Sequence, residues 1–387
     1  MKKCLVSLVS EQTIPNLLLA IHFKPDYLLF ITTEKMEKQN KTQAILNTLK
    51  LRHLDYDQRH HKVEVQEDSI IDLQTKVSQW LSQIQEDYQF VVNITGGTKI
   101  MSLATYDFFK EVGSDIIYVP IPQNKYLIPF PKLRPKPPGV ISERLTVREY
   151  LTACNFIIPN PDTIEKNRQR AFSRKELTKF IFDHYQGLKP LLKRLWQKLP
   201  MKYKNELEFN EQILLENEEQ KCLLKKLGFL VNENNISKKI NKSEWYYLRG
   251  GWLEERLFLA VAEVLSPEKG DVQLGVNCMD QHKNENEFDV LFTFENVLYL
   301  IECKSLDPAE SKEDRIGITD FLYKLGALRP HFGLTPRAFF ASTSENLYDD
   351  HGELKSKLID RAKQSNTEII PLLKITDLEG YFRNIFF

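Results

Sequence analysis

Two carboxylates and a lysine interrupt a pair of apolar segments in the last third of the chain. The segments are residues 288–294 and 297–304, and only the polar pair Glu295–Asn296 separates them. Aromatic and aliphatic runs joined by two polar residues are typical of a β-hairpin. A turn centred on that pair would place Asp289 opposite Glu302, with Cβ atoms about 4.5–5.5 Å apart.

Charged side chains in such a setting need a partner. Because side chains alternate along a strand, Lys304 shares a face with Glu302, and Cys303 points the other way. Two carboxylates this close repel each other unless a proton or a cation lies between them. A hard divalent cation with oxygen ligands, Mg²⁺ or Mn²⁺, meets that requirement. The alternative is a structural strand pair with a buried glutamate–lysine ion pair.

The spacing Asp-x12-Glu-Cys-Lys resembles the core of the PD-(D/E)XK, or restriction-endonuclease-like, superfamily, although the proline of the motif is missing. The resemblance implies that Asp289, Glu302 and the backbone carbonyl of Cys303 hold the metal ion. It also implies that Lys304 orients or activates the attacking water. A metal in this position lowers the pKa of bound water and neutralises charge that develops at the phosphate.

A second acidic candidate precedes the hairpin. Residues 249–265 place apolar side chains at helical spacing behind two glycines, which predicts a helix. The stretch from Gly250 to Glu254 resembles the Gly-x-x-x-Glu start of the helix that carries an extra acidic ligand in the same superfamily. Glu254 is the preferred candidate and Glu255 the second. A solvated acidic first turn, favoured by the helix dipole, is the alternative.

Composition limits the other possibilities. A chain of 387 residues with 42% hydrophobic and 27% charged residues predicts two or three folded domains, with no net charge to indicate a nucleic-acid binder. The five cysteines show no CxxC spacing, which suits a reducing cytosol and argues against a zinc site. No signal peptide and no apolar run of about 18 residues is found, so we expect a cytoplasmic protein without a membrane partner.

The N-terminal part alternates strand-like and helix-like segments. Such alternation predicts βαβ units and a parallel sheet with helices on both faces. Ligands of such sheets bind at the carboxyl ends of the strands, near the point where strand order reverses. The expected strands are 4–9, 27–32, 62–65, 90–94 and 116–119, and the expected helices are 15–23, 35–54, 70–84 and 100–112.

Two loops follow expected strands and carry polar residues. The first contains Ser10, Glu11 and Gln12, and the second runs from Asn93 to Ser102. Paired glycines let a phosphate-bearing ligand approach the backbone, and the following helix start and lysine favour an anion. Neither a Walker A loop nor GxGxxG is present. A tight strand-to-helix turn is the alternative.

The second loop, Asn-x-Thr-Gly-Gly-Thr-Lys-x-Met, resembles the signature of CARF domains, the CRISPR-associated Rossmann fold. The resemblance implies a homodimer that binds a cyclic oligoadenylate, here cyclic tetra-adenylate, across its two-fold axis. The residues implied to line the pocket are Ser10, Glu11, Gln12, Asn93, Thr95, Gly96, Gly97, Thr98, Lys99 and Met101.

The expected fold is therefore α/β in three parts. Residues 1–145 form a Rossmann-like parallel-sheet CARF domain, 146–245 a linker that is partly helical and partly extended, and 246–387 a restriction-endonuclease-like mixed α/β domain. Residues 120–138 are rich in proline and predict a stiff exit from the first domain. Within the linker, residues 164–204 hold twelve Lys or Arg and three Asp or Glu. That run is a nucleic-acid track or a solvated face. Residues 230–240 and 244–248 are expected to form a small hairpin.

This domain order resembles the ancillary nucleases of type III CRISPR defence. The resemblance implies that cyclic tetra-adenylate activates metal-dependent cleavage of DNA, RNA or both. One alternative is a cyclic-oligoadenylate-responsive regulator whose inactive nuclease fold binds nucleic acid without cleaving it. Another is a nuclease that a different nucleotide regulates.

Overall fold

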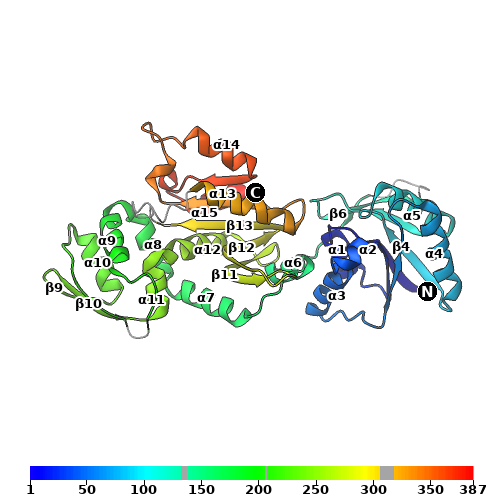
Figure 1. The fold of residues 1–387 in the computed structure, drawn as a ribbon, viewed down its shortest axis with the longest axis horizontal. Coiled ribbons are helices and arrows are strands. Elements are labelled where there is room, and N and C mark those ends of the chain that lie inside the picture. The colour runs from blue at the N-terminus through cyan, green and yellow to red at the C-terminus, as the bar shows by residue number, and fades with distance from the viewer. Residues whose placement is uncertain (132–136, 205–206, 306–317, 387) are drawn as a thin grey trace.

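The computed structural model describes residues 1–131, 137–204, 207–305 and 318–386. Figure 1 shows a chain extended along one axis, with the N-terminal sheet at one end and the mixed sheet of the C-terminal part in the middle. A small sheet with surrounding helices lies at the other end. Part of the proline-rich passage, residues 132–136, lies outside the described residues.

The N-terminal sheet has seven strands in the order β3-β2-β1-β4-β5-β6-β7. The first five in chain order are parallel, which confirms the predicted fold class, and β6 and β7 are antiparallel. Strand order reverses at β1, which lies between β2 and β4. The strands are β1 (Lys2–Leu8), β2 (Tyr27–Thr32), β3 (His60–Glu64), β4 (Tyr88–Asn93), β5 (Asp115–Tyr118), β6 (Lys125–Phe130) and β7 (Gly139–Val140).

Helices cover both faces of this sheet. α1 (Ile14–Phe23) and α3 (Lys41–Leu51) pack in one apolar cluster, and α4 (Ile70–Gln83) and α5 (Lys99–Glu111) in another. The single helix expected at 35–54 is wrong. The chain forms α2 (Glu34–Lys38) and then α3, because Asn40 takes a left-handed φ of 54° that ends one helix before the other begins.

The C-terminal sheet has the order β11-β12-β13-β14-β15, antiparallel through β13 and parallel beyond it. Alternate side chains of β14 enter different cores, since Phe339 joins the cluster of α12 and α15, whereas Phe340 packs with α13. The elements are α12 (Trp252–Val264), β11 (Gly270–Met279), β12 (Glu285–Phe294), β13 (Val297–Lys304), α13 (Ile318–Leu328), β14 (Arg337–Ser342), α14 (Ser356–Gln364), β15 (Thr367–Ile370) and α15 (Leu378–Phe386).

The part of the chain that lies, in sequence, between the N-terminal and the C-terminal sheet is mainly helical. Its helices surround a three-stranded sheet of order β8-β10-β9. The expected hairpin strand at 244–248 is wrong, because Asn241 and Glu244 form a reciprocal capping box that starts a helix. The elements are α7 (Pro161–Ser173), α8 (Lys175–Asp183), α9 (Tyr185–Lys198), β8 (Leu207–Gln212), α10 (Glu218–Lys226), β9 (Leu230–Asn232), β10 (Asn235–Ile240) and α11 (Lys242–Tyr246).

One short helix, α6 (Val147–Ala153), joins the two large sheets. Its buried residues belong to an apolar cluster that includes Leu17 of α1 and Leu291 of β12. Tyr150 donates a hydrogen bond to the carbonyl of Phe332, 3.1 Å away. The contact between the domains is therefore packed. None of the helices in the described ranges has the length and apolarity needed to span a bilayer.

Candidate active site and sensor loops

The hairpin of β12 and β13 has the register that the sequence predicts. Paired residues run from Phe294–Val297 to Val290–Ile301. Both turn residues have positive φ, 50° and 64°, as a type I′ turn requires. Beyond the last pair, the backbone amide of Cys303 donates to Asp289 Oδ2 at 2.7 Å. The hairpin therefore holds the Asp289 carboxylate against the segment that carries Glu302 and Lys304.

The two hairpin carboxylates differ in their partners. Glu302 is 5% exposed and accepts an ion pair from Lys324 of α13, with Nζ and Oε2 3.4 Å apart. Burial and, next in size, the negative charge of Glu302 together raise the pKa of Asp289 to about 7. The Lys304 ammonium lies 4.3 Å from the centre of the Phe321 ring. The ion-pair partner of the buried Glu302 is thus the exposed Lys324, which spacing along the hairpin does not reveal.

Glu254 approaches these carboxylates from α12. Burial raises its pKa well above the usual range, and the charge of Asp289 adds to that effect. The Tyr246 hydroxyl donates to both Glu254 oxygens, at 2.9 and 2.7 Å. Gly250 makes this approach possible, since its φ of 129° is unfavourable for other residues and a Cβ there would lie 2.4 Å from Ser305 Oγ.

Glu255, the second candidate, points to a different partner. It is 6% exposed and forms a bidentate ion pair with Arg174, whose Nε donates to Oε2 at 3.2 Å. Its carboxylate therefore fastens α12 to the region of α7 and α8. The structure brings Glu254, and not Glu255, to the hairpin acids.

The donor set suits a hard divalent cation. Burial and the charge of a neighbouring carboxylate raise the pKa of both Asp289 and Glu254, and clustered carboxylate oxygens are the ligands that such a cation prefers. Within the described ranges, however, no three His, Cys, Asp or Glu side chains are already arranged to hold a metal ion. The residues fit a metal chemically, and metal binding remains a proposal.

The two N-terminal loops leave the sheet at its switch point. Asn93, at the end of β4, is fully buried and donates from Nδ2 to Asn16 Oδ1 at 2.6 Å. Its Oδ1 accepts from the amide of Thr95 at 3.1 Å, which holds the loop in a tight turn. A Cβ on Gly96 would lie 2.4 Å from the carbonyl of Leu8. Close packing of the two loops therefore requires glycine there.

The other loop residues divide between surface and core. Lys99 and Gly97 are exposed, and Ser10, Thr95, Gly96 and Thr98 are half-buried. Met101 is 1% exposed, and Thr98 accepts from its amide at 3.2 Å to cap α5. Asn93 and Met101 are thus placed to support the loop from within.

The first loop has partners on its own domain and beyond. Glu11 is exposed and pairs with Lys35 at 3.0 Å, so its carboxylate has a neutralising neighbour. Gln12 Oε1 accepts a hydrogen bond from the amide of Leu334 at 3.1 Å. A Cβ on Gly333 would lie 2.7 Å from the same oxygen. Gln12 therefore contacts the C-terminal domain directly.

Two family models match this chain, one in its N-terminal part and one in its C-terminal part. The family model of the Card1 CARF domain matches residues 4–150, and that of the Card1-like endonuclease domain matches residues 241–384. The chain joins a Card1 CARF domain to a Card1-like endonuclease domain. No curated protein matches it by sequence.

Two solved structures share this fold over nearly their whole length. Protein VC1899 from Vibrio cholerae has a TM-score of 0.78 at 19% identity, covering 99% of this chain and 98% of that one. Can2 from Sulfobacillus thermosulfidooxidans, in complex with cyclic tetra-adenylate, has a TM-score of 0.74 at 20% identity, with the same coverage. At these identities the likeness shows the fold alone.

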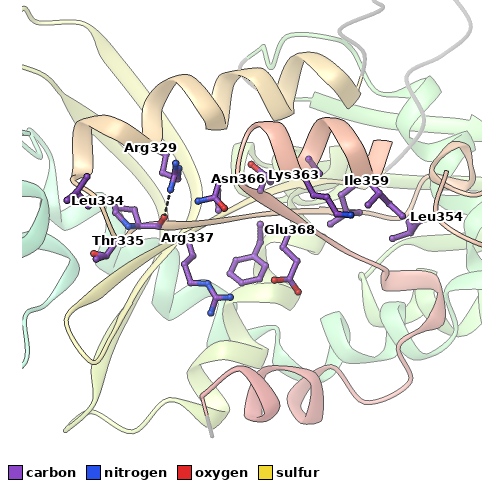
Figure 2. A pocket seen from close by; sticks show the side chains of 15 residues that line it. Arg329, Leu334, Thr335, Arg337, Leu354, Ile359, Lys363, Asn366 and Glu368 are labelled. Carbon is purple, nitrogen blue, oxygen red and sulfur yellow. Dashed lines mark hydrogen bonds between the residues drawn. The ribbon is translucent and has the colours of Figure 1, made fainter. Parts of the chain in front are cut away.

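A cavity of about 520 Å³ lies elsewhere in the endonuclease domain, between α14 and the starts of β14 and β15. Figure 2 shows Arg329, Arg337 and Glu368 among its lining residues, with Arg329 hydrogen-bonded to a carbonyl of the same wall. The candidate acids lie at the opposite end of these strands, because Lys304 pairs with Ser342 at the end of β14. This cavity is therefore separate from the candidate active site.

Proposed function

We propose that this protein is a metal-dependent endonuclease that cyclic tetra-adenylate activates. The observation that carries the proposal is the approach of Asp289, Glu302 and Glu254 from three elements, β12, β13 and α12, of a Card1-like endonuclease domain. The sensor is the Card1 CARF domain. Its activator is proposed from the complex of Can2 with cyclic tetra-adenylate, and the role in type III CRISPR defence from the resemblance of the whole domain order.

In this proposal Asp289, Glu302 and the carbonyl of Cys303 hold Mn²⁺ or Mg²⁺, with Glu254 supporting them. When bound, the metal neutralises charge at the scissile phosphate and lowers the pKa of water. The Asp289 carboxylate is held by the amide of Cys303, and Tyr246 keeps Glu254 in place. Lys304 orients the attacking water, since its ammonium lies on the strand that carries Glu302.

Lys324 has a different role, in the protein without a bound metal ion. Its ammonium neutralises the buried Glu302 carboxylate, which would otherwise face Asp289 without a cation. A divalent ion that binds Glu302 replaces this ion pair. α13, which carries Lys324, leads into the loop that contacts Gln12. The contact from sensor loop to α13 offers a route by which activator binding alters the active site.

Exposed apolar side chains support the proposed homodimer. Ile70 and Ile71 at the start of α4 are 47% and 78% exposed, and Ile100 and Leu103 at the start of α5 are 38% and 66% exposed. The two helices pack against each other, so these residues lie beside the sensor loop. A second copy of the CARF domain would cover them and bring two sensor loops together.

The proposal is tested by cleavage of single-stranded DNA, single-stranded RNA and supercoiled plasmid. Each substrate is incubated with Mn²⁺, with and without cyclic tetra-adenylate, using wild type and Glu302→Gln. We expect cleavage by the wild type only with the activator, and none by the variant. Equal cleavage by both proteins would refute the site. Cleavage without activator would refute the regulation, and tight activator binding without any cleavage would favour a regulator.

A further inference from the structure

A second cavity, of about 410 Å³, opens beside Glu254. Its walls come from α7, from α11 and from the facing strands β11 and β12, which lie together in Figure 1. Asn277 and Glu287, a pair on β11 and β12, form part of the lining. The cavity therefore connects the middle region of the chain with the candidate active site.

The basic run at 164–204 contributes selectively to this cavity. Several of its cations are held by nearby acids, with Lys175–Glu263 at 2.9 Å and Lys198–Glu211 at 2.8 Å. Arg170 of α7 differs, because it lines the cavity, is exposed, and forms no ion pair with any other described residue. Arg174 also lines the cavity but is paired with Glu255, so Arg170 is the cation of this run that borders the cavity without an ion pair among the described residues.

Lys242 of α11 supplies a second cation. It also lines the cavity, is exposed and makes no ion pair within the described part of the chain. Two cations without ion-pair partners thus border a cavity lined by three carboxylates, of which Glu255 is paired with Arg174 and Glu254 and Glu287 are not paired with a cation of the described ranges. A polyanion that must approach these acids needs such cations along its path.

Tyr246 supplies an aromatic surface at the same place. Its hydroxyl is fixed on Glu254, and its ring lies against Gly251, where a Cβ would be 2.6 Å from Cδ1. The residue is nevertheless 44% exposed. A ring that is fixed through its hydroxyl and one edge, and is still partly exposed in a cavity bordered by two cations, is suited to stacking on an unpaired base.

We propose that this cavity binds a single strand of nucleic acid next to the scissile phosphate. Arg170 and Lys242 contact backbone phosphates, and the ring of Tyr246 stacks on the adjacent base. The inference rests on the proposed nuclease function, and it selects a single strand because bases in a duplex already stack on each other. The cavity volume is that of a nucleotide-sized ligand site.

The test measures binding of a fluorescein-labelled 12-nucleotide single-stranded DNA, and of an RNA of the same sequence, by fluorescence anisotropy. It uses the full chain in EDTA, with and without cyclic tetra-adenylate, at several salt concentrations. Each phosphate contact contributes about 0.7 to the slope of log affinity against log salt. Arg170→Ala/Lys242→Ala should lower that slope by about 1.4. Lys166→Ala, an exposed cation on α7 outside the cavity, is the matched control and should bind as wild type.

Tyr246 is tested separately with a strand that carries 2-aminopurine, whose fluorescence falls on stacking. Tyr246→Phe should keep the quenching and the affinity, whereas Tyr246→Ala should lose the quenching and about tenfold in affinity. The thermal unfolding midpoint of each variant reports whether it is folded. If Tyr246→Ala does not fold, the salt dependence of binding by Arg170→Ala/Lys242→Ala alone tests the inference.

The outcomes separate this inference from the proposed function. Unchanged strand affinity and salt slope in the double variant would overturn the inference, even if the wild type cleaves nucleic acid with activator. Absence of any strand binding by the wild type would also overturn it. A reduced slope in a protein that never cleaves would support the strand site and refute the nuclease.

Discussion

Replacing Gly250 with alanine should displace the start of α12 relative to the candidate active site. Gly250 has a φ of 129°, and a Cβ there would lie 2.4 Å from Ser305 Oγ, just past the end of β13. Such a backbone conformation costs an ordinary residue about 1–3 kcal/mol, and forced overpacking adds about 1–3 kcal/mol. We therefore expect Gly250→Ala to lower the free energy of unfolding by about 2–6 kcal/mol.

The effect on cleavage should be larger than the effect on folding. Glu254 lies one helical turn beyond Gly250, so relief of the clash moves its carboxylate relative to Asp289. A displacement of about 1 Å costs on the order of 100-fold in rate at a catalytic site. Single-turnover cleavage with saturating activator measures this loss, and urea unfolding measures the stability.

Two further variants distinguish the cost of the positive φ from the cost of the clash with Ser305. Gly352 also has a positive φ, 75°, but a Cβ there would meet nothing within 4 Å. Gly352→Ala should therefore cost about 1 kcal/mol in stability and leave cleavage intact. Ser305→Ala removes the clashing oxygen, so the double variant Gly250→Ala/Ser305→Ala should regain part of the lost rate, as a double-mutant cycle can show. Wild-type cleavage by Gly250→Ala, or no recovery in the double variant, would refute the reasoning.

Three other predictions concern charge. In the metal-free protein the pKa of Asp289 is raised from 3.8 to about 7, so the folded state binds more protons than the unfolded state between these values and loses stability as pH rises. The Asp289 contribution to this loss should be about 3 kcal/mol between pH 5 and pH 8. Urea unfolding in EDTA should show it as the amount by which the pH dependence of wild type exceeds that of Asp289→Asn, because the variant keeps the raised pKa values of Glu254 and Glu255. Glu379→Gln breaks a 2.6 Å ion pair with the buried Arg256 and should lower the free energy of unfolding by about 3 kcal/mol. Glu353→Gln breaks an exposed ion pair and should lower it by less than about 1 kcal/mol. Equal losses in urea unfolding would contradict the argument. Lys99→Ala should weaken binding of cyclic tetra-adenylate about tenfold or more in a calorimetric titration, and Lys110→Ala, at the far end of the same helix, should not.

The sequence predicted the parts of the site that depend on local order. Alternating strands and helices were sufficient to predict the parallel sheet and to place two loops at the carboxyl ends of its strands. The polar pair after Phe294 set the hairpin register, because a two-residue turn permits few pairings. Local signals also misled where single residues decide the backbone. Asn40 divides an expected helix, and Glu244 begins a helix where a strand was expected.

Only the tertiary structure decided which charged and aromatic side chains meet. Glu254 and Glu255 are adjacent in sequence, and the choice between them depends on Arg174, which is 81 residues away. The contact of Gln12 with Leu334 spans 322 residues, and no spacing in either segment indicates it. Periodicity determines which face of an element a residue occupies, whereas packing of the domains determines what that face meets.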